Sequence, residues 1–444
     1  MTEPRPTSRE VWRIAAPLVV SNVSVPLLGM VDTGVTGHLD DAAYLGAVAV
    51  GSALFGFLFI AFNFLRMGTT GVAAQQFGRN DFDALRSSLG QAAIVALAIA
   101  ALLLVLQKPL GAIGLALLGP EPDVLVHAER YFSIRIWSAP ATLLGYALIG
   151  WFIGLQDART PLAIVVTTNV VNVVLDLWFV LGLDMKVAGV AWASVIAEYS
   201  GVVLGLAFAL RALRRHPGRW RTEDLKAPSA YAAFLSINAR LFVRTIALVG
   251  TLTFVTAQGA RLGGLVLAAN AILMNLQNLI SFVLDALAHA AEALVGKAIG
   301  EGSAGRLRRS VSLSLRWSVA MALGFCAVFA IGGGYLIALL TDLPDVRATA
   351  NTYLPWMILS PIVSVWSFTY DGVFVGATRA KEMRDIMLLS ALVVFLPAWY
   401  LLQPWGNHGL WLAFTLFMAA RGVGMHWAYR RWVLPDVNAR LTSD

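Results

Sequence analysis

Long apolar runs recur from one end of this chain to the other, and each is long enough to cross a lipid bilayer. A membrane-spanning helix needs about 20 consecutive apolar residues, and stretches such as LGQAAIVALAIAALLLVLQ and SVAMALGFCAVFAIGGGYLIALL reach that length. Of the 444 residues, 58% are hydrophobic and 13% are charged, which is typical of an integral membrane protein. The sequence predicts an all-α integral membrane protein with twelve transmembrane helices, at about 11–36, 47–75, 89–113, 127–154, 161–183, 188–211, 230–258, 265–294, 311–340, 348–376, 385–403 and 407–431.

The lysine and arginine residues indicate how these spans are oriented. Short cytoplasmic loops of membrane proteins are enriched in these two residues. Of the 33 in this chain, 23 fall on the side of the N-terminus, 6 fall on the opposite side and 4 lie inside spans. We therefore expect a multi-pass protein of the bacterial cell (inner) membrane with both termini in the cytoplasm. Topology and anionic lipid headgroups account for the positive charge, so we expect no nucleic-acid partner.

The sequence offers little for enzyme chemistry or metal binding. Twelve spans leave only short loops, with no room for a soluble catalytic domain. Cys326 is the only cysteine, so no disulfide or cysteine-based metal cluster can form within one chain. The six histidines show no metal-ligand spacing, and no P-loop or Ser/His/Asp order is present. We predict that the protein is not an enzyme and has neither a metal site nor a cofactor other than a coupling ion.

The two halves of the chain resemble each other at a constant offset. GWFIGLQDAR from Gly150 aligns with GVFVGATRAK from Gly372, an offset of 222 residues, and the same offset aligns YLGAVAVG from Tyr44 with VLAANAIL from Val266. A duplicated six-helix unit explains this, and its even helix number orients both copies alike, as in some secondary transporters. We expect two pseudo-symmetric lobes, an N-terminal six-helix lobe at 1–210 and a C-terminal six-helix lobe at 230–444, joined by a basic cytoplasmic loop at 211–229.

Three acidic residues of the first half lie within predicted spans. A charged side chain inside the membrane costs a few kcal/mol and by default marks a transport path. Asp32 lies about one helical turn inside the outer end of its span, Asp176 about two turns and Glu198 about three. At the offset of 222, Asp32 and Asp176 correspond to the apolar Phe254 and Ala398. We predict that the three acids surround one cavity in the outer half of the N-terminal lobe.

Asn169, Asn172 and Asp176 follow one another at spacings of three and four residues, so they share one helix face. A row of amides leading to a carboxylate suits a hydrated pocket that passes a proton or holds a cation. Alternatively, these polar side chains bond neighbouring helices across the bundle.

The second half carries further polar candidates. Arg240 and Arg244, four residues apart, are placed to pair with the acids Asp285, Glu292 and Asp371, in an ion-paired network near the cytoplasmic face. Several polar side chains of this half either line a substrate cavity or bond neighbouring helices; they are Asn270, Asn275, Asn278, Tyr370 and Asp371.

Taken in order, PLLGMVDTGVTGHL, FLRMGTTGVAAQQFG, GWFIGLQDARTP, GVAWASVIAEYSG and YDGVFVGATRAKEMR resemble the multidrug and toxic compound extrusion (MATE) family, and within it the DinF branch. The resemblance covers nearly the whole chain. It implies two six-helix lobes around a central cavity that opens alternately to each side, and export of organic cations driven by inward H⁺ or Na⁺.

The resemblance also implies roles for particular residues. Asp32 matches the first-helix aspartate whose protonation has been argued to bend that helix, and Asn172 and Asp176 match the fifth-helix pair in the same pocket. Asp371 resembles a tenth-helix aspartate linked to cation binding in the Na⁺-coupled branch. This chain departs from that branch in NARLFVRT, which supplies arginines and no intramembrane acid. The departure favours H⁺ over Na⁺ as the coupling ion.

We therefore expect a monomeric multidrug efflux antiporter, in which protonation of Asp32, Asp176 or both competes with a cationic or lipophilic substrate. Alternatives are a Na⁺-coupled exporter of the family, a lipid or lipid-linked-sugar flippase of the same superfamily, and a channel. A flippase would need a more cationic lumen, and duplicated lobes fit alternating access better than a channel.

Pro26 lies six residues before Asp32, about 9 Å along a helix axis. Its missing N–H weakens the helix at that turn, so Pro26 is a candidate hinge biased by the carboxyl group of Asp32. The alternative is a static kink compensated by Ser21 or Asn22.

Overall fold

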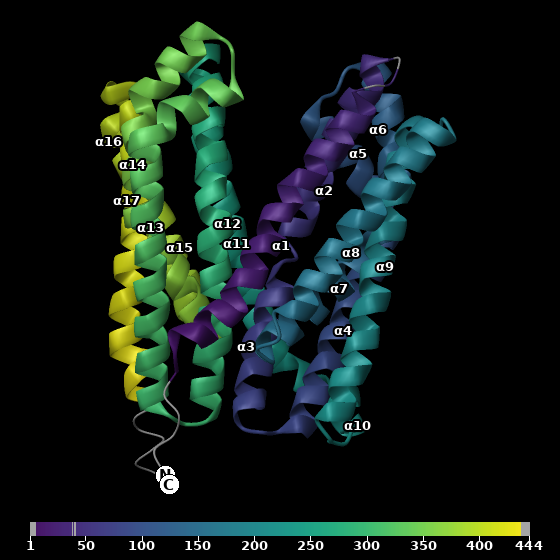
Figure 1. Ribbon diagram of the computed structural model, residues 1–444, viewed down its shortest axis with the longest axis vertical. Helices are drawn as coiled ribbons and strands as arrows, with labels where there is room; N and C mark the ends of the chain where they lie inside the picture. The colour runs from purple at the N-terminus through teal and green to yellow at the C-terminus, as the bar shows by residue number, and fades with distance from the viewer. Residues whose placement is uncertain (1–5, 38, 40, 437–444) are drawn as a thin grey trace. The chain divides into compact units, whose positions relative to one another are not determined.

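The structure is a computed structural model that describes residues 6–37, 39 and 41–436 (Figure 1). Arg5 and Arg440, two of the basic residues that indicate the topology, lie outside the described residues. Every regular element within the described residues is a helix. The helices of the first half are α1 (Ser8–Thr36), α2 (Ala42–Ile60), α3 (Phe64–Gly78), α4 (Phe82–Val105), α5 (Gln107–Leu118), α6 (Pro122–Arg135), η1 (Ile136–Ser138), α7 (Ala139–Gly154), α8 (Arg159–Asp176), η2 (Leu177–Gly182) and α9 (Lys186–Arg215). They are followed by α10 (Thr222–Lys226), α11 (Pro228–Arg261), α12 (Gly264–Gly300), α13 (Ala304–Leu340), α14 (Pro344–Gly376), α15 (Ala380–Leu389), η3 (Ser390–Phe395), α16 (Leu396–Leu402), η4 (Gln403–Trp405), α17 (Gly406–Ala428) and η5 (Tyr429–Val433).

The helices account for the twelve predicted spans. Ten helical stretches of the described chain are long and apolar enough to cross a membrane. One of them, Ala380–Asp436, contains two predicted spans that meet at Gly406, where φ is +55°. The 29-residue α1 is a further helix of membrane-spanning length. The predicted all-α membrane fold is therefore confirmed.

Three of the spans are not the continuous helices that the sequence suggested. The chain leaves the α-helix between α2 and α3, at Leu106 between α4 and α5, and at η1 between α6 and α7. Pro140 explains the third break, because proline has no N–H to donate to the preceding turn and is best placed just inside a helix start. Apolar periodicity gives no sign of such breaks.

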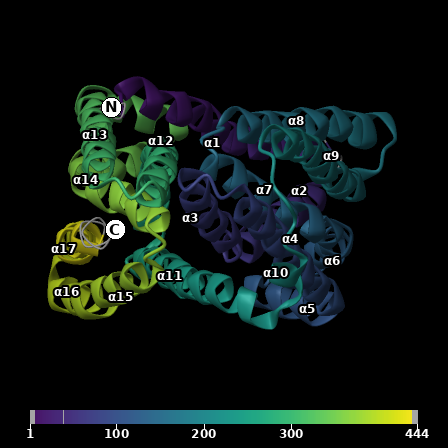
Figure 2. The same cartoon turned by 90° about the horizontal axis from the view of Figure 1, so that it is seen from below.

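The described residues form two compact units. One unit contains residues 17–234, and the other contains residues 235–436 together with residues 6–16. The short N-terminal part of α1 belongs to the second unit, where the rings of Trp12 and Trp317 meet edge to face at 5.3 Å. In the first unit α7 packs against α3, α4 and α9, and α8 lies alongside α9 (Figure 2). In the second unit α14 packs against α12, α13 and α17.

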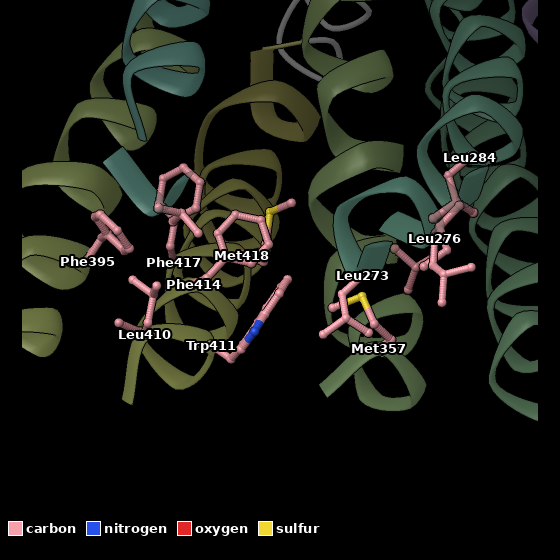
Figure 3. Close-up of a cluster of buried hydrophobic side chains, with 14 of the residues drawn as sticks. Leu273, Leu276, Leu284, Met357, Phe395, Leu410, Trp411, Phe414, Phe417 and Met418 are labelled. Atoms are coloured by element: carbon pink, nitrogen blue, oxygen red, sulfur yellow. The ribbon is translucent and has the colours of Figure 1, made fainter. Parts of the chain in front are cut away.

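Each unit has its own apolar core. In the second unit, aromatic side chains of α17, including Trp411, Phe414 and Phe417, pack with Phe395 from η3 (Figure 3). In the first unit, Trp151 of α7 is fully buried and donates a hydrogen bond from Nε1 to the Leu85 carbonyl at 3.0 Å. These cores hold rigid helices on which polar side chains can be positioned.

The closest helix contacts repeat between the units at the offset of 222. A Cβ atom on Gly150 of α7 would overlap the carbonyl oxygen of Arg66 on α3, and one on Gly372 of α14 would overlap that of Ala288 on α12. Position 66 plus the same offset is position 288. One turn later, a Cβ on Gly154 would lie 2.9 Å from Ala74 N, and a Cβ on Gly376 would lie 3.0 Å from Gly296 N. The equivalent helix pairs therefore cross at equivalent glycines, as a duplication requires.

These crossings give a prediction about stability. Replacing Gly372 by Ala forces α14 away from the Ala288 carbonyl, and overpacking of this kind costs about 1–3 kcal/mol of unfolding free energy. Gly324→Ala is the matched control, since no atom lies within 4 Å of the added Cβ and alanine favours the helix by about 0.5–1 kcal/mol. Thermal unfolding of the purified protein in detergent measures both. Equal stability of the two variants would contradict the close crossing.

Candidate functional site

The Asp32 and Asp176 side chains meet in the first unit, from α1 and from the end of α8. The two carboxyl groups lie close enough to interact with each other. Asp176 is completely buried, whereas Asp32 is only partly buried. Within the described residues, Asp176 Oδ1 receives no hydrogen bond from a donor group. Two ionised carboxylates repel each other at such close range, so this arrangement suits a bound proton or cation that neutralises part of their charge.

Asn172 lies one turn before Asp176 on α8 and is also buried, at 1% exposure. In the amide orientation that satisfies both of its polar ends, its nitrogen donates to Asp176 Oδ2 at 3.1 Å. Its oxygen then accepts from the Ser194 backbone N–H of α9 at 3.2 Å. Asn172 therefore fixes one oxygen of Asp176 and leaves the other for protonation chemistry.

Asn169 joins α8 to α1 one turn further from Asp176. Its Nδ2 donates to Ser24 Oγ at 3.0 Å and to the Ser24 carbonyl at 3.3 Å. Ser24 and Asn169 line a cavity of about 340 Å³ between α1 and α8, whose other walls are valines. Pro26 lies two residues beyond Ser24 in an exposed turn of α1, and α1 is assigned as a single helix through it.

Glu198 of α9 is paired with Arg135, one of the six lysine and arginine residues that the sequence places on the outer side. Arg135, the last residue of α6, approaches Glu198 Oε1 with Nη2 at 3.4 Å. Its guanidinium also lies over the Phe55 ring, 5.6 Å from the centroid, and interacts electrostatically with Asp32 and Asp176. The sequence signal for Arg135 was weak, because it stands near the end of its predicted span. The outer-side assignment missed its proximity to the acids.

The charges of this group do not balance when every acid is ionised. Asp32, Asp176 and Glu198 carry three negative charges, and Arg135 supplies one positive charge. Unbalanced charge in a buried site is costly unless a proton or a cation neutralises it. The site is therefore suited to take up protons, an organic cation, or each in turn.

In the second unit, Asp371 of α14 is enclosed by two arginines. Its Oδ2 accepts from Arg421 Nη2 of α17 at 2.8 Å and contacts Arg244 Nη2 of α11. All three residues are buried, with less than 10% of their surface exposed. Arg421 also interacts electrostatically with Asp285, and Glu292 lies 3.2 Å from the ring nitrogen Nδ1 of His289. The arginines therefore occupy the carboxylate that the family resemblance had linked to cation binding.

The remaining candidates of the second unit differ in their surroundings. Asn270 and Asn407 exchange amide hydrogen bonds of 2.8 and 2.9 Å, so Asn270 joins α12 to α17. Asn275 and Asn278 are exposed on α12 and remain placed to meet a solute. Tyr370 is buried, and its hydroxyl lies 2.5 Å from His426 Nδ1.

Comparisons with known proteins agree with this architecture. The sequence model of the MatE family matches residues 17–178 and 241–401, one segment in each half. "DNA damage-inducible protein F" of Escherichia coli (strain K12) is 40% identical over 433 residues, covering 96% of this chain and 94% of that protein. "Multidrug and toxin extrusion protein 1" of Homo sapiens is 24% identical over 431 residues, covering 94% of this chain and 74% of that protein.

Solved structures share the fold. A crystal structure of "MATE in the bent conformation" matches with a TM-score of 0.88 at 16% identity, covering 97% of this chain and 96% of that one. One described as "MATE in the straight conformation" matches with a TM-score of 0.87 at 16% identity. Since the family model matches both halves and a relative aligns at 40% identity over nearly the whole length, the chain belongs to the MATE family of multidrug efflux transporters.

Proposed function

We propose that this transporter exports organic cationic and lipophilic compounds in exchange for protons that enter the cell. The observation that carries the proposal is the close approach of the Asp32 and Asp176 carboxyl groups, with Asn172 fixing the second. A proton bound there and a cation bound nearby compensate the same negative charge, so each weakens the binding of the other. Because the proton and the cation compete for one site, entry of the proton is coupled to exit of the cation, which is antiport.

The order of proton uptake follows from the difference in burial between Asp32 and Asp176. Asp32 is the more accessible carboxyl and takes up a proton from the external side, after which the proton is shared with buried Asp176. Neutralisation removes the attraction for a bound cation, which then leaves outward. When the site faces the cytoplasm, proton loss restores the charge and a new cation binds. All of these residues come from one chain, so a monomer suffices.

We further propose that α1 bends at Pro26 during this cycle. Proline supplies no N–H to the carbonyl one turn earlier, so the helix is weakest there. Asp32 lies six residues away, and Asn169 holds Ser24 on the other side of the proline at 3.0 Å. A change in the charge of Asp32 therefore acts on a helix whose preceding turn is tethered. Spin-label distances across α1 at low and high pH test this, and a curvature independent of pH supports a static kink.

The proposed orientation places both termini in the cytoplasm of a bacterial cell and the protein in the inner membrane. It rests on the lysine and arginine distribution, with 23 of 33 on that side. The outer ends of α1 and α8 then face the exterior, the source of the protons.

Na⁺ coupling is the second candidate, and the Asp371 contacts argue against its use of the second unit. Asp371 Oδ2 already meets both Arg244 and Arg421, so only Oδ1 lacks a hydrogen-bond partner among the described residues. A positive ion entering that group would face two guanidinium charges.

Reconstitution into vesicles with separately imposed gradients tests the proposal. We expect a pH gradient alone, acidic on the external face, to drive export of a fluorescent cationic dye, and a Na⁺ gradient alone to drive little. Collapsing the pH gradient with a protonophore stops transport. Export driven only by Na⁺ would replace this proposal with the Na⁺-coupled alternative.

A further inference from the structure

The second unit contains two adjoining basic cavities, at the end of its helices that we propose to be cytoplasmic. The first cavity, of about 530 Å³, lies between α13, α14 and the end of α17. The second, of about 590 Å³, lies at the start of α13 and shares Arg308 and Ser312 with the first. Neither belongs to the Asp32 site, which is built in the other unit.

Each wall of the first cavity is a row of side chains at helical spacing. Arg308, Ser312 and Arg316 follow one another at four-residue intervals on one face of α13. The opposite walls repeat this spacing with polar and aromatic side chains, Trp366 and Tyr370 on α14, and His426 on α17 followed by Arg430 on η5. The cavity is therefore formed by matched faces of three rigid helices.

Arg306 in the second cavity is paired with Glu301 at 3.0 Å, but the other arginines of the two cavities have no acidic partner among the described residues. Among the described residues, Arg308, Arg316 and Arg430 have no carboxylate within salt-bridge distance, and neither cavity has an Asp or Glu in its lining. Arg308, Arg316 and Arg430 are exposed, unlike Arg244 and Arg421, which are buried and share Asp371. Arginines gathered without acids attract an anion, and the planar fork of donors on each suits phosphate oxygens.

The depth of the cavities matches the lipid headgroups. α13 has 37 residues and is therefore about 55 Å long, whereas a bilayer with its headgroups is about 40–45 Å thick. One end of α13 must protrude by roughly 10–15 Å if the other is level with the surface. Arg308 and Arg316 lie about 6 and 18 Å along the helix axis from Ala304. The headgroup layer therefore falls between the depths of these two arginines. Trp366 is 40% exposed beside them, as expected for an aromatic residue at a membrane interface.

We propose that these two cavities bind the phosphate headgroup of an anionic phospholipid of the cytoplasmic leaflet. The arginines of α13 and η5 hold the phosphate, the Ser312 hydroxyl donates to it, and the acyl chains leave past Trp366 into the bilayer. A bound lipid joins α13 to α17, two helices that each pack on α14. The site is independent of the transport chemistry, but its leaflet rests on the proposed orientation.

Native mass spectrometry of the full-length protein tests the proposal, with phosphatidylglycerol and phosphatidylcholine titrated separately. We expect phosphatidylglycerol to be retained more tightly. An arginine near the membrane surface contributes about fivefold to binding of an anionic lipid, so the triple variant Arg308→Gln/Arg316→Gln/Arg430→Gln should lose about a hundredfold. Arg430→Gln alone should lose about fivefold in affinity for phosphatidylglycerol. This single variant is the test if the triple variant fails to fold.

The matched control removes the same charge elsewhere. Arg211→Gln/Arg214→Gln/Arg215→Gln takes three exposed arginines from the end of α9, outside both cavities. It should retain the wild-type preference for phosphatidylglycerol. An equal loss in the control, or equal retention of phosphatidylcholine, would overturn the proposal. Inorganic phosphate that binds as tightly as the lipid would also overturn it, by assigning the cavities to a soluble anion.

Discussion

Asp32→Asn is expected to lose export driven by a pH gradient while keeping the fold. The amide has the shape of a protonated carboxyl group and cannot ionise, so the site loses both a proton acceptor and a charge that attracts cations. Coupling between two ligands of one protein is commonly worth about 5- to 150-fold in affinity. We expect dye accumulation in inverted vesicles to fall by about tenfold or more, and dye affinity to lose most of its dependence on pH.

Asp176→Asn tests the same contact from its buried side. It should also uncouple transport, because Asp32 then has no second carboxyl group with which to share a proton. Asp123→Asn is the control, since it removes an exposed acid of α6 in the same unit. Should Asp32→Asn export dye with the full pH-gradient dependence of the wild type, the proposed proton site would be wrong.

Features that depend on local sequence could be predicted. Hydrophobic length predicted the twelve spans, since a bilayer requires long apolar helices whatever their neighbours. The offset of 222 also predicted an equivalence that the structure shows in atomic contacts, with Gly150 meeting Arg66 as Gly372 meets Ala288. Glycine is informative at such crossings because only a residue without a Cβ permits backbone contact between helices.

Contacts between distant parts of the chain could not be predicted from composition and spacing. Asp371 and Arg421 are 50 residues apart, and Asn270 and Asn407 are 137 apart, so no periodic pattern connects them. The sequence offered Asp285, Glu292 and Asp371 as acidic partners for Arg244, but it did not identify which of the three was the partner. A candidate acid in a membrane span can be a transport site or half of an ion pair. Only the tertiary contacts of the acid distinguish these two roles.

This distinction divides the acids of the chain. Asp32 and Asp176 meet each other, and Asp371 meets two arginines. In the proposed mechanism, the first arrangement is balanced by mobile charge, a proton or a cation. The second is balanced by fixed charge and therefore stabilises the unit without depending on a gradient.

Asp371→Asn should accordingly reduce stability strongly. Removing this carboxylate leaves the guanidinium groups of Arg244 and Arg421 buried side by side without their common partner. Breaking a buried ion pair in this way costs about 3–5 kcal/mol of unfolding free energy. Thermal unfolding of the purified protein in detergent measures the loss. Arg421→Met should cost less, because Arg244 still neutralises Asp371 and the apolar side chain fits beside Phe417, over which the guanidinium now lies at 5.4 Å.

The matched control is Asp342→Asn, which breaks the ion pair of 2.7 Å between Asp342 and Arg347 in a loop where Asp342 is fully exposed. Exposed pairs contribute about 0–1 kcal/mol, because water solvates both charges when they separate. The three variants should therefore rank Asp371→Asn, Arg421→Met and Asp342→Asn in decreasing loss of stability. If Asp371→Asn were as stable as Asp342→Asn, the carboxylate would not be needed to hold the arginines, and the argument against a cation at Asp371 would lose its basis.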